Sequence, residues 1–261
     1  MWAGHFIHGF MEVAHLHWVN ENRPIPVSAA FPLGVIPRLA HDVFVRLASV
    51  GLHPRGPNVA WLAVERAFAM VEQFGDAIFP FIAHSEITLQ GVREATLADF
   101  RGMNRYEVLG IVDILATSAS ETPSGINDHP LARPLVRLDV EQEVILDYKG
   151  MRRPSTSDEI WTHQEWQVNT YAWLRNREEP GTDIPFGGLI YVNELVPTND
   201  NFNAMIREIR EGTTDVTPNT AEALVLSDPA TLRRDFTGAM RQWRQDMNIW
   251  WNDHWREQDW G

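Results

Sequence analysis

The chain has 261 residues, of which 44% are hydrophobic and 22% charged, a balance that excludes disordered and fibrous proteins. It contains no cysteine, which excludes disulfides, cysteine-held zinc or iron–sulfur centres and thiolate catalysis. The net charge is −13, whereas a protein that coats nucleic acid is normally basic. Any contact with nucleic acid is therefore expected to use a local basic strip.

Targeting and membrane signals are the next feature of the sequence. No run of about 18 apolar residues is present, so we expect no membrane-spanning helix and no membrane partner. The first ten residues lack the basic residue that precedes the apolar part of a secretory signal peptide. These two observations lead us to expect a cytoplasmic protein.

The order of predicted elements indicates the fold class. Apolar residues at helical spacing predict helices over residues 5–20, 36–50 and 58–75. Runs of Ile, Val and Leu predict strands over 81–91, 105–117 and 135–148, with a polar, turn-rich insert at 118–130. A helix over 157–176, a strand over 186–196 and helices over 201–211 and 229–256 follow. This order predicts an α/β domain with a mixed sheet flanked by helices.

The third predicted strand ends in an acid and a lysine. Asp147 and Lys149 are two residues apart, so their side chains point to the same face of the strand. Lys149 is also the only lysine among 22 basic residues. It is either a chance survivor of a codon bias toward arginine or a position where a compact ammonium is needed and a guanidinium does not fit. A carboxylate beside an ammonium suits phosphodiester chemistry, because the acid can hold a cation and the lysine can orient water. The alternative interpretation is a salt-bridged strand end.

A second acid lies inside the preceding strand. Asp113 stands between Val112 and Ile114, and a buried aspartate needs a cation or hydrogen-bond donors. Two neighbouring strands with one inward acid each predict a two-carboxylate metal site. The alternative is a solvent-facing or capping aspartate.

Several histidines and carboxylates are further candidates. His8, Glu12 and His15 share one face of the first helix, a pattern that suits either a metal site or a partly buried polar stripe. His84 and Glu86 lie on the first strand and are interpreted as a polar pair on the strand face. Gln167 and Tyr171 are four residues apart on one helix face.

Four of these motifs occur in a recognisable order. Gly4-x-x-x-His8, Gly110-Ile111-Val112-Asp113, Asp147-Tyr148-Lys149 and Gln167-x-x-x-Tyr171 together resemble the PD-(D/E)XK nuclease superfamily, in its RecB-like branch. The resemblance runs from about residue 4 to about residue 195. It implies a restriction-endonuclease-like fold in a single domain over 1–261. Within that domain we expect a helical part at 1–80, a catalytic core at 81–200 and C-terminal helices at 201–261.

The resemblance also implies roles for individual residues. Asp113, Asp147, His8 and the backbone carbonyl of Tyr148 would bind Mg²⁺ or Mn²⁺, and Lys149 would orient the attacking water. Gln167 and Tyr171 would support the site and touch the nucleic-acid backbone. The candidates for the basic strip are the arginines that flank the site in the sequence: Arg152, Arg153, Arg175 and Arg177.

The sequence departs from the family pattern in three places. Thirty-three residues separate Asp113 from Asp147, and the third motif has an aspartate where many relatives have glutamate. The cysteines that hold an iron–sulfur cluster in several relatives are absent, so no such cluster is expected. Packing of the last helix by Trp243, Met247, Trp250 and Trp251 is one interpretation of that segment; base stacking or a partner surface is another.

The leading functional hypothesis is a metal-dependent deoxyribonuclease, an exonuclease in recombination, repair, phage replication or defence. The alternative is a catalytically degenerate nuclease fold that acts as a DNA-binding or scaffold subunit. The acidic net charge suits that alternative, and it also suits dependence on a basic partner protein that delivers the substrate. Besides DNA, the expected partners are a partner protein or a second copy of the chain. A carboxylate-pair glycosidase is a third interpretation, but it does not explain Lys149.

Overall fold

The computed structural model describes residues 2–94, 105–119, 126, 132–152, 154, 159–196, 198, 200, 201, 204, 207, 211 and 249–251. Its helices are α1 (Trp2–Asn20), α2 (Val35–Ser49), α3 (Pro57–Ile78), α4 (Ala132–Leu135) and α5 (Glu159–Glu178). Its strands are β1 (Ile82–Glu94), β2 (Arg105–Ala116), β3 (Val144–Lys149), β4 (Gly187–Tyr191) and β5 (Ile249–Trp251).

The strands form one mixed sheet in the order β1-β2-β3-β4-β5. β1, β2 and β3 are successively antiparallel, β3 and β4 are parallel, and β5 is antiparallel to β4. A parallel pair needs a crossover connection, and α5 is part of the segment that joins β3 to β4. The predicted class, an α/β domain with a mixed sheet flanked by helices, is therefore confirmed.

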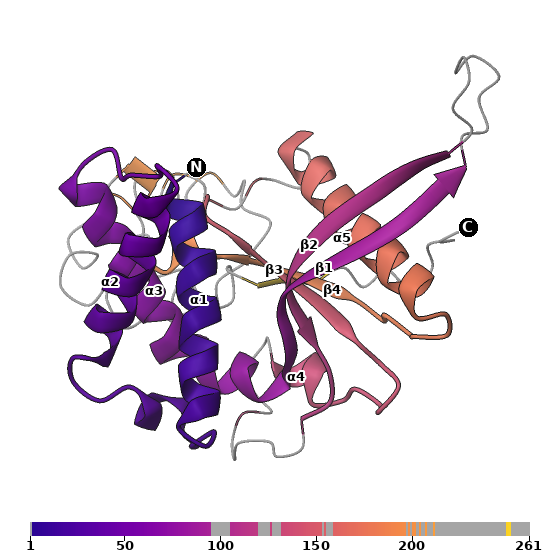
Figure 1. Ribbon diagram of the computed structural model, residues 1–261, viewed down its shortest axis with the longest axis horizontal. Coiled ribbons are helices and arrows are strands. Elements are labelled where there is room, and N and C mark those ends of the chain that lie inside the picture. The colour runs from indigo at the N-terminus through magenta and orange to yellow at the C-terminus, as the bar shows by residue number, and fades with distance from the viewer. Residues whose placement is uncertain are drawn as a thin grey trace.

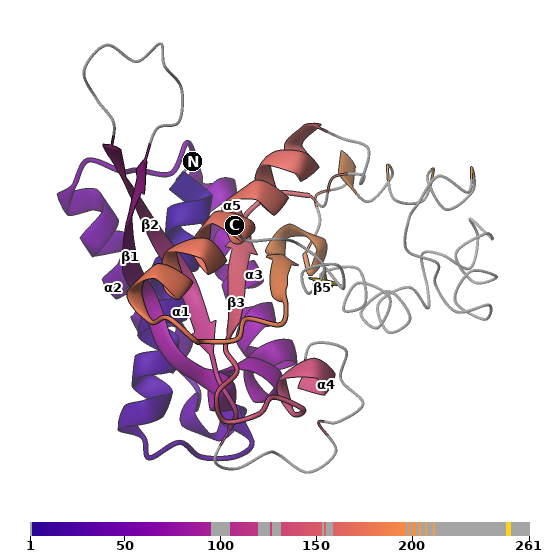
Figure 2. The ribbon, with the colours of Figure 1, turned by 90° about the vertical axis from the view of Figure 1, so that its right-hand side faces the viewer.

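Helices cover both faces of the sheet. Figure 1 shows α1, α2 and α3 gathered on one side, with α5 running behind the β1–β2 hairpin. Figure 2 shows α5 in front of the strands, on the face of the sheet away from α1, α2 and α3. A large core lies between the N-terminal helices and the sheet and includes Phe6, Phe10, Phe74, Ile114 and Leu146. A smaller core lies between the sheet and α5 and includes Leu89, Ile145, Val168, Leu174 and Leu189.

The local sequence explains how the N-terminal helices begin and pack. In α1, Trp2, Phe6, Phe10 and Ala14 recur every four residues and are all buried. α3 begins with Pro57 in its first turn, where the missing N–H has no intrahelical partner to lose. The three helices predicted from apolar spacing are confirmed, with their ends moved by a few residues.

Three predicted elements differ from the structure. The strand predicted over 186–196 ends at Tyr191, and Val192–Glu194 form a short 3-10 helix. The strand predicted over 135–148 begins only at Val144, because Asp139 and Gln142 close a turn in which each backbone N–H bonds to the other residue. Val140 in that turn is 88% exposed, so its apolar side chain does not mark a strand. Ile249–Trp251 form strand β5 rather than part of a helix over 229–256. The other residues of that predicted helix lie outside the described residues.

No helix among the described residues is both long and apolar enough to cross a lipid bilayer.

Candidate functional site

The site lies where β2 and β3 separate. The two strands pair through Ile114–Ala116 and Val144–Leu146. Beyond these pairs, the backbone N–H of Tyr148 bonds to a side chain of β2: it donates a hydrogen bond of 2.7 Å to Oδ2 of Asp113. Asp113 is therefore held in the fork between the strands and is only 5% exposed.

His8 reaches this fork from α1. Its Nδ1 lies 3.0 Å from Oδ1 of Asp113, and its Nε2 donates a hydrogen bond of 3.0 Å to the backbone carbonyl of Tyr148. The approach depends on glycine, because a Cβ at Gly150 would lie 3.1 Å from the Cα of Gly4. Three of the four groups that the family resemblance names as metal ligands are thus in contact: His8, Asp113 and the Tyr148 carbonyl.

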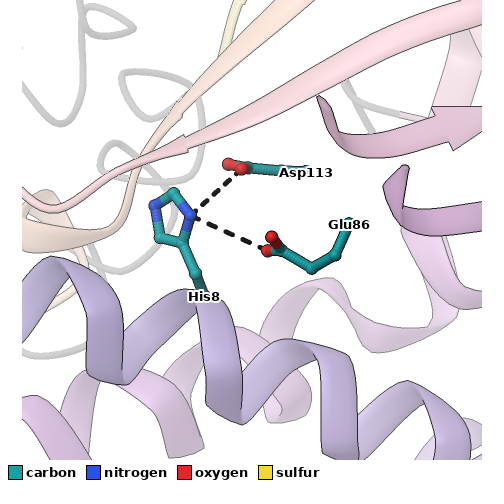
Figure 3. A group of neighbouring side chains, drawn as sticks. All are labelled: His8, Glu86 and Asp113. Atoms are coloured by element: carbon teal, nitrogen blue, oxygen red, sulfur yellow. Dashed lines mark ion pairs between the residues drawn. The ribbon is translucent and has the colours of Figure 1, made fainter. Parts of the chain in front are cut away.

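Glu86 joins them from β1. In the antiparallel register it falls between the pairs Ser85–Ile114 and Ile87–Val112, and so comes opposite Asp113. Its Oε1 lies 3.9 Å from Nδ1 of His8. Figure 3 shows the side chains of His8, Glu86 and Asp113 converging from the helix and the two strands. One ligand atom from each of the three residues lies within 4.8 Å of the others.

A second chain of contacts runs along the α5 side. The ammonium of Lys149 forms an ion pair with Oδ2 of Asp147 and donates a hydrogen bond of 2.6 Å to Oε1 of Gln167. Nε2 of Gln167 in turn donates to the hydroxyl of Tyr171 at 2.6 Å. Asp147 is 2% exposed, so its charge is neutralised mainly by Lys149. The structure therefore brings the third and fourth motifs together, with the Asp147 carboxylate directed to Lys149.

Burial and the neighbouring carboxylates shift the pKa values of the site. Burial alone would lower the pKa of His8, but its hydrogen bond to Asp113 and the charges of Asp113, Asp147 and Glu86 raise it from 6.5 to about 9. Burial and the neighbouring Asp113 raise the pKa of Glu86 to about 7. Burial also raises the pKa of Asp147, with a further contribution from Asp113 against the attraction of Lys149. A positive charge at this position therefore stabilises the ionised acids.

The hydroxyls next to the acids are held neutral. Burial, followed by the charges of Asp113 and Glu86, raises the pKa of Tyr148 well above its usual value. Burial raises the pKa of Tyr171 to about 12, although its hydrogen bond with Gln167 acts in the opposite direction. Neither tyrosine is therefore a proton acceptor near neutral pH.

The other residues of the polar stripe on α1 do not join this cluster. Glu12 accepts a hydrogen bond of 2.9 Å from Arg46, and the ring of His15 packs against Trp18 and Phe79. Burial lowers the pKa of His15 to about 4, so this ring is neutral. His84 is exposed, while Glu86, two residues further along β1, faces the cluster.

The expected basic strip is only partly present in the described residues. Arg175 is 8% exposed and forms two hydrogen bonds with Glu143, at 2.7 and 2.8 Å, and one with Glu179. Its inclusion in the strip is wrong, because these carboxylates already use its donors. Arg177 is exposed and its guanidinium lies 5.3 Å from the ring centre of Trp173. Arg152 is partly buried, and Arg153 lies outside the described residues.

The place of Glu86 in the cluster is not predicted by the sequence. Alternation along β1 could place it on the same face as His84, but no local signal shows which strand lies opposite. The signal that could have found it is the pairing of β1 with β2, which sets Glu86 opposite Asp113.

A comparison with models of known protein families found no match for this chain, and a comparison with curated protein sequences found none either.

Proposed function

We propose that this chain is a metal-dependent nuclease that hydrolyses phosphodiester bonds in DNA. One observation carries the proposal: residues from four motifs, spread over more than 160 positions of the sequence, meet at the fork between β2 and β3. The resemblance to RecB-like nucleases supports an exonuclease of recombination, repair, phage replication or defence. The mixed sheet with α5 between β3 and β4 supports the restriction-endonuclease-like fold.

The donor set fits a divalent cation. His8 and Asp113 offer an imidazole nitrogen and a carboxylate oxygen that lie 3.0 Å apart. The Tyr148 carbonyl is hydrogen-bonded to the other ring nitrogen of His8. Carboxylate and carbonyl oxygens suit Mg²⁺ and Mn²⁺, and an imidazole favours Mn²⁺ relative to an all-oxygen site. Such a cation supplies positive charge to the scissile phosphate and lowers the pKa of the attacking water.

The chain's own residues supply the remaining chemistry. Lys149 is fixed between Asp147 and Gln167, so its ammonium has a defined direction from which to orient water and neutralise developing charge. Gln167 is held in turn by Tyr171, which is nine-tenths buried against the sheet. These two residues are positioning residues for Lys149, and their contact with the nucleic-acid backbone remains a prediction.

The experiment is a cleavage assay with purified protein on three substrates: linear duplex DNA, covalently closed circular DNA and single-stranded DNA. Each is incubated with Mg²⁺, with Mn²⁺ and with EDTA. We expect degradation of linear or single-stranded DNA with either cation and none with EDTA. Degradation of linear but not circular duplex would assign exonuclease activity. Binding of DNA without cleavage under every condition would favour the degenerate scaffold instead.

A further inference from the structure

The position of Glu86 poses an electrostatic problem. Glu86 and Asp113 stand opposite each other on antiparallel strands, where two like charges destabilise the pairing. Water screens Asp113 poorly, because its side chain is 5% exposed, and Glu86 itself is partly buried. A positive charge between the two carboxylates would relieve this repulsion.

The positively charged side chains described nearby relieve this repulsion only in part. Lys149 pairs with Asp147, and Arg46 pairs with Glu12, one helical turn along α1 from His8. His8 remains, and its Nδ1 lies 3.0 Å from Asp113 but 3.9 Å from Glu86. One imidazole therefore faces two carboxylates, and it makes a short contact with only one of them.

The backbone at Glu86 also departs from regular strand geometry. Glu86 has a φ of 53°, in the left-handed region that non-glycine residues rarely occupy, and the register of β1 against β2 shifts between Ile82 and His84. With this backbone, the carboxylate of Glu86 points toward His8 (Figure 3). A regular strand with a small polar residue at position 86 would avoid both the strain and the charge repulsion.

We propose that Glu86 is a ligand of the divalent cation, together with His8 and Asp113. This proposal adds a ligand from β1 to the motif residues. The Asp147 carboxylate is paired with Lys149. The identity of the cation as Mg²⁺ or Mn²⁺ rests on the proposed nuclease function, whereas the ligand role of Glu86 rests on the geometry of the three side chains.

The test measures Mn²⁺ binding directly, by isothermal titration calorimetry on the full chain without DNA. Glu86→Gln keeps the shape of the side chain and removes one negative charge. Its matched control is Glu72→Gln, which removes the same charge from an exposed position on α3. We expect Glu86→Gln to weaken Mn²⁺ binding at least ~10-fold and the control to leave it unchanged, since loss of a metal-site partner typically costs 10–100-fold. Equal affinity in all three proteins, or no Mn²⁺ binding by the wild type, would overturn the proposal.

Crystals of the wild type soaked in Mn²⁺ give a second measurement that does not depend on the variant folding. Anomalous density within about 2.5 Å of a Glu86 carboxylate oxygen is expected, and density bonded to other residues but not to Glu86 would overturn the proposal. Glu86-dependent binding in a protein that cleaves no nucleic acid would remove the proposed function and keep this site. Cleavage of nucleic acid together with Mn²⁺ binding that does not depend on Glu86 would keep the proposed function and remove Glu86 as a ligand.

Discussion

Gly110 packs against the ring of Tyr171, and a Cβ at position 110 would come within 2.7 Å of Cε1 of that ring. Because Gly110 has no side chain, α5 can pack closely on β2 at this position. Tyr171 holds Gln167, and Gln167 holds Lys149, so this close contact also fixes the position of the ammonium. The glycine of the second motif and the tyrosine of the fourth therefore form one structural unit.

Gly110→Ala is expected to destabilise the fold and to impair the site. Tyr171 and Leu174 would have to move away from the new methyl group, and overpacking of this kind costs about 1–3 kcal/mol. Denaturant unfolding measures the loss of stability. Gly56→Ala is the control, since a Cβ at Gly56 meets nothing within 4 Å and its φ of 174° is ordinary extended backbone. Equal losses in the two variants would contradict the packing argument.

Burial of His15 is expected to make the free energy of unfolding depend on pH. Its pKa is lowered by burial to about 4, while the unfolded chain has a histidine pKa of about 6.5. The unfolded state therefore binds the extra proton first, so the free energy of unfolding falls as the pH decreases from about 6.5 to about 4. The contribution of this one group is at most about 3 kcal/mol.

The measurement for His15 is denaturant unfolding of the wild type and His15→Phe between pH 7 and pH 4. Phenylalanine fits an aromatic site beside Trp18 and Phe79 and does not titrate. Other groups titrate alike in both proteins, so the difference between the two curves isolates His15. We expect His15→Phe to lose less stability than the wild type on acidification; parallel curves would show that His15 is not buried in its neutral form.

Lys149→Arg is expected to abolish most cleavage although it preserves the charge. The space between Asp147 and Gln167 holds a compact ammonium, and the guanidinium is broader and does not release a proton near neutral pH. We predict a loss of at least ~100-fold in cleavage rate, the scale of one positioned electrostatic group. Fluorescence anisotropy with labelled DNA should show nearly unchanged binding. Cleavage at the wild-type rate would mean that Lys149 does not orient the water.

Particular residues show what the sequence could and could not predict. The runs of apolar residues around Asp113 and Asp147 predict buried strands, because consecutive apolar residues are buried only when both faces of a strand are covered. The contact of His8 with Asp113 follows only from the family resemblance, since nothing local relates α1 to β2. The position of Glu86 opposite Asp113 depends on the register of β1 against β2, which is a long-range property.

Other errors arise from partners that are distant in the sequence. Arg175 was predicted to face nucleic acid, but Glu143, at a separation of 32 residues, binds it at the start of β3. Ile249–Trp251 carry the aromatic residues of a predicted helix, yet pairing with β4 makes them a strand. In both cases tertiary contacts override a pattern that is locally reasonable.

The most direct test of the nuclease assignment compares wild type and Asp113→Asn in a time course on linear and single-stranded DNA with Mn²⁺. Asparagine keeps an oxygen to accept the Tyr148 N–H but removes the charge that faces His8. We predict that the wild type degrades the DNA, that EDTA stops it, and that Asp113→Asn is at least ~100-fold slower while still folded by circular dichroism. Equal cleavage by the two proteins, or no cleavage by the wild type, would contradict the proposed nuclease function.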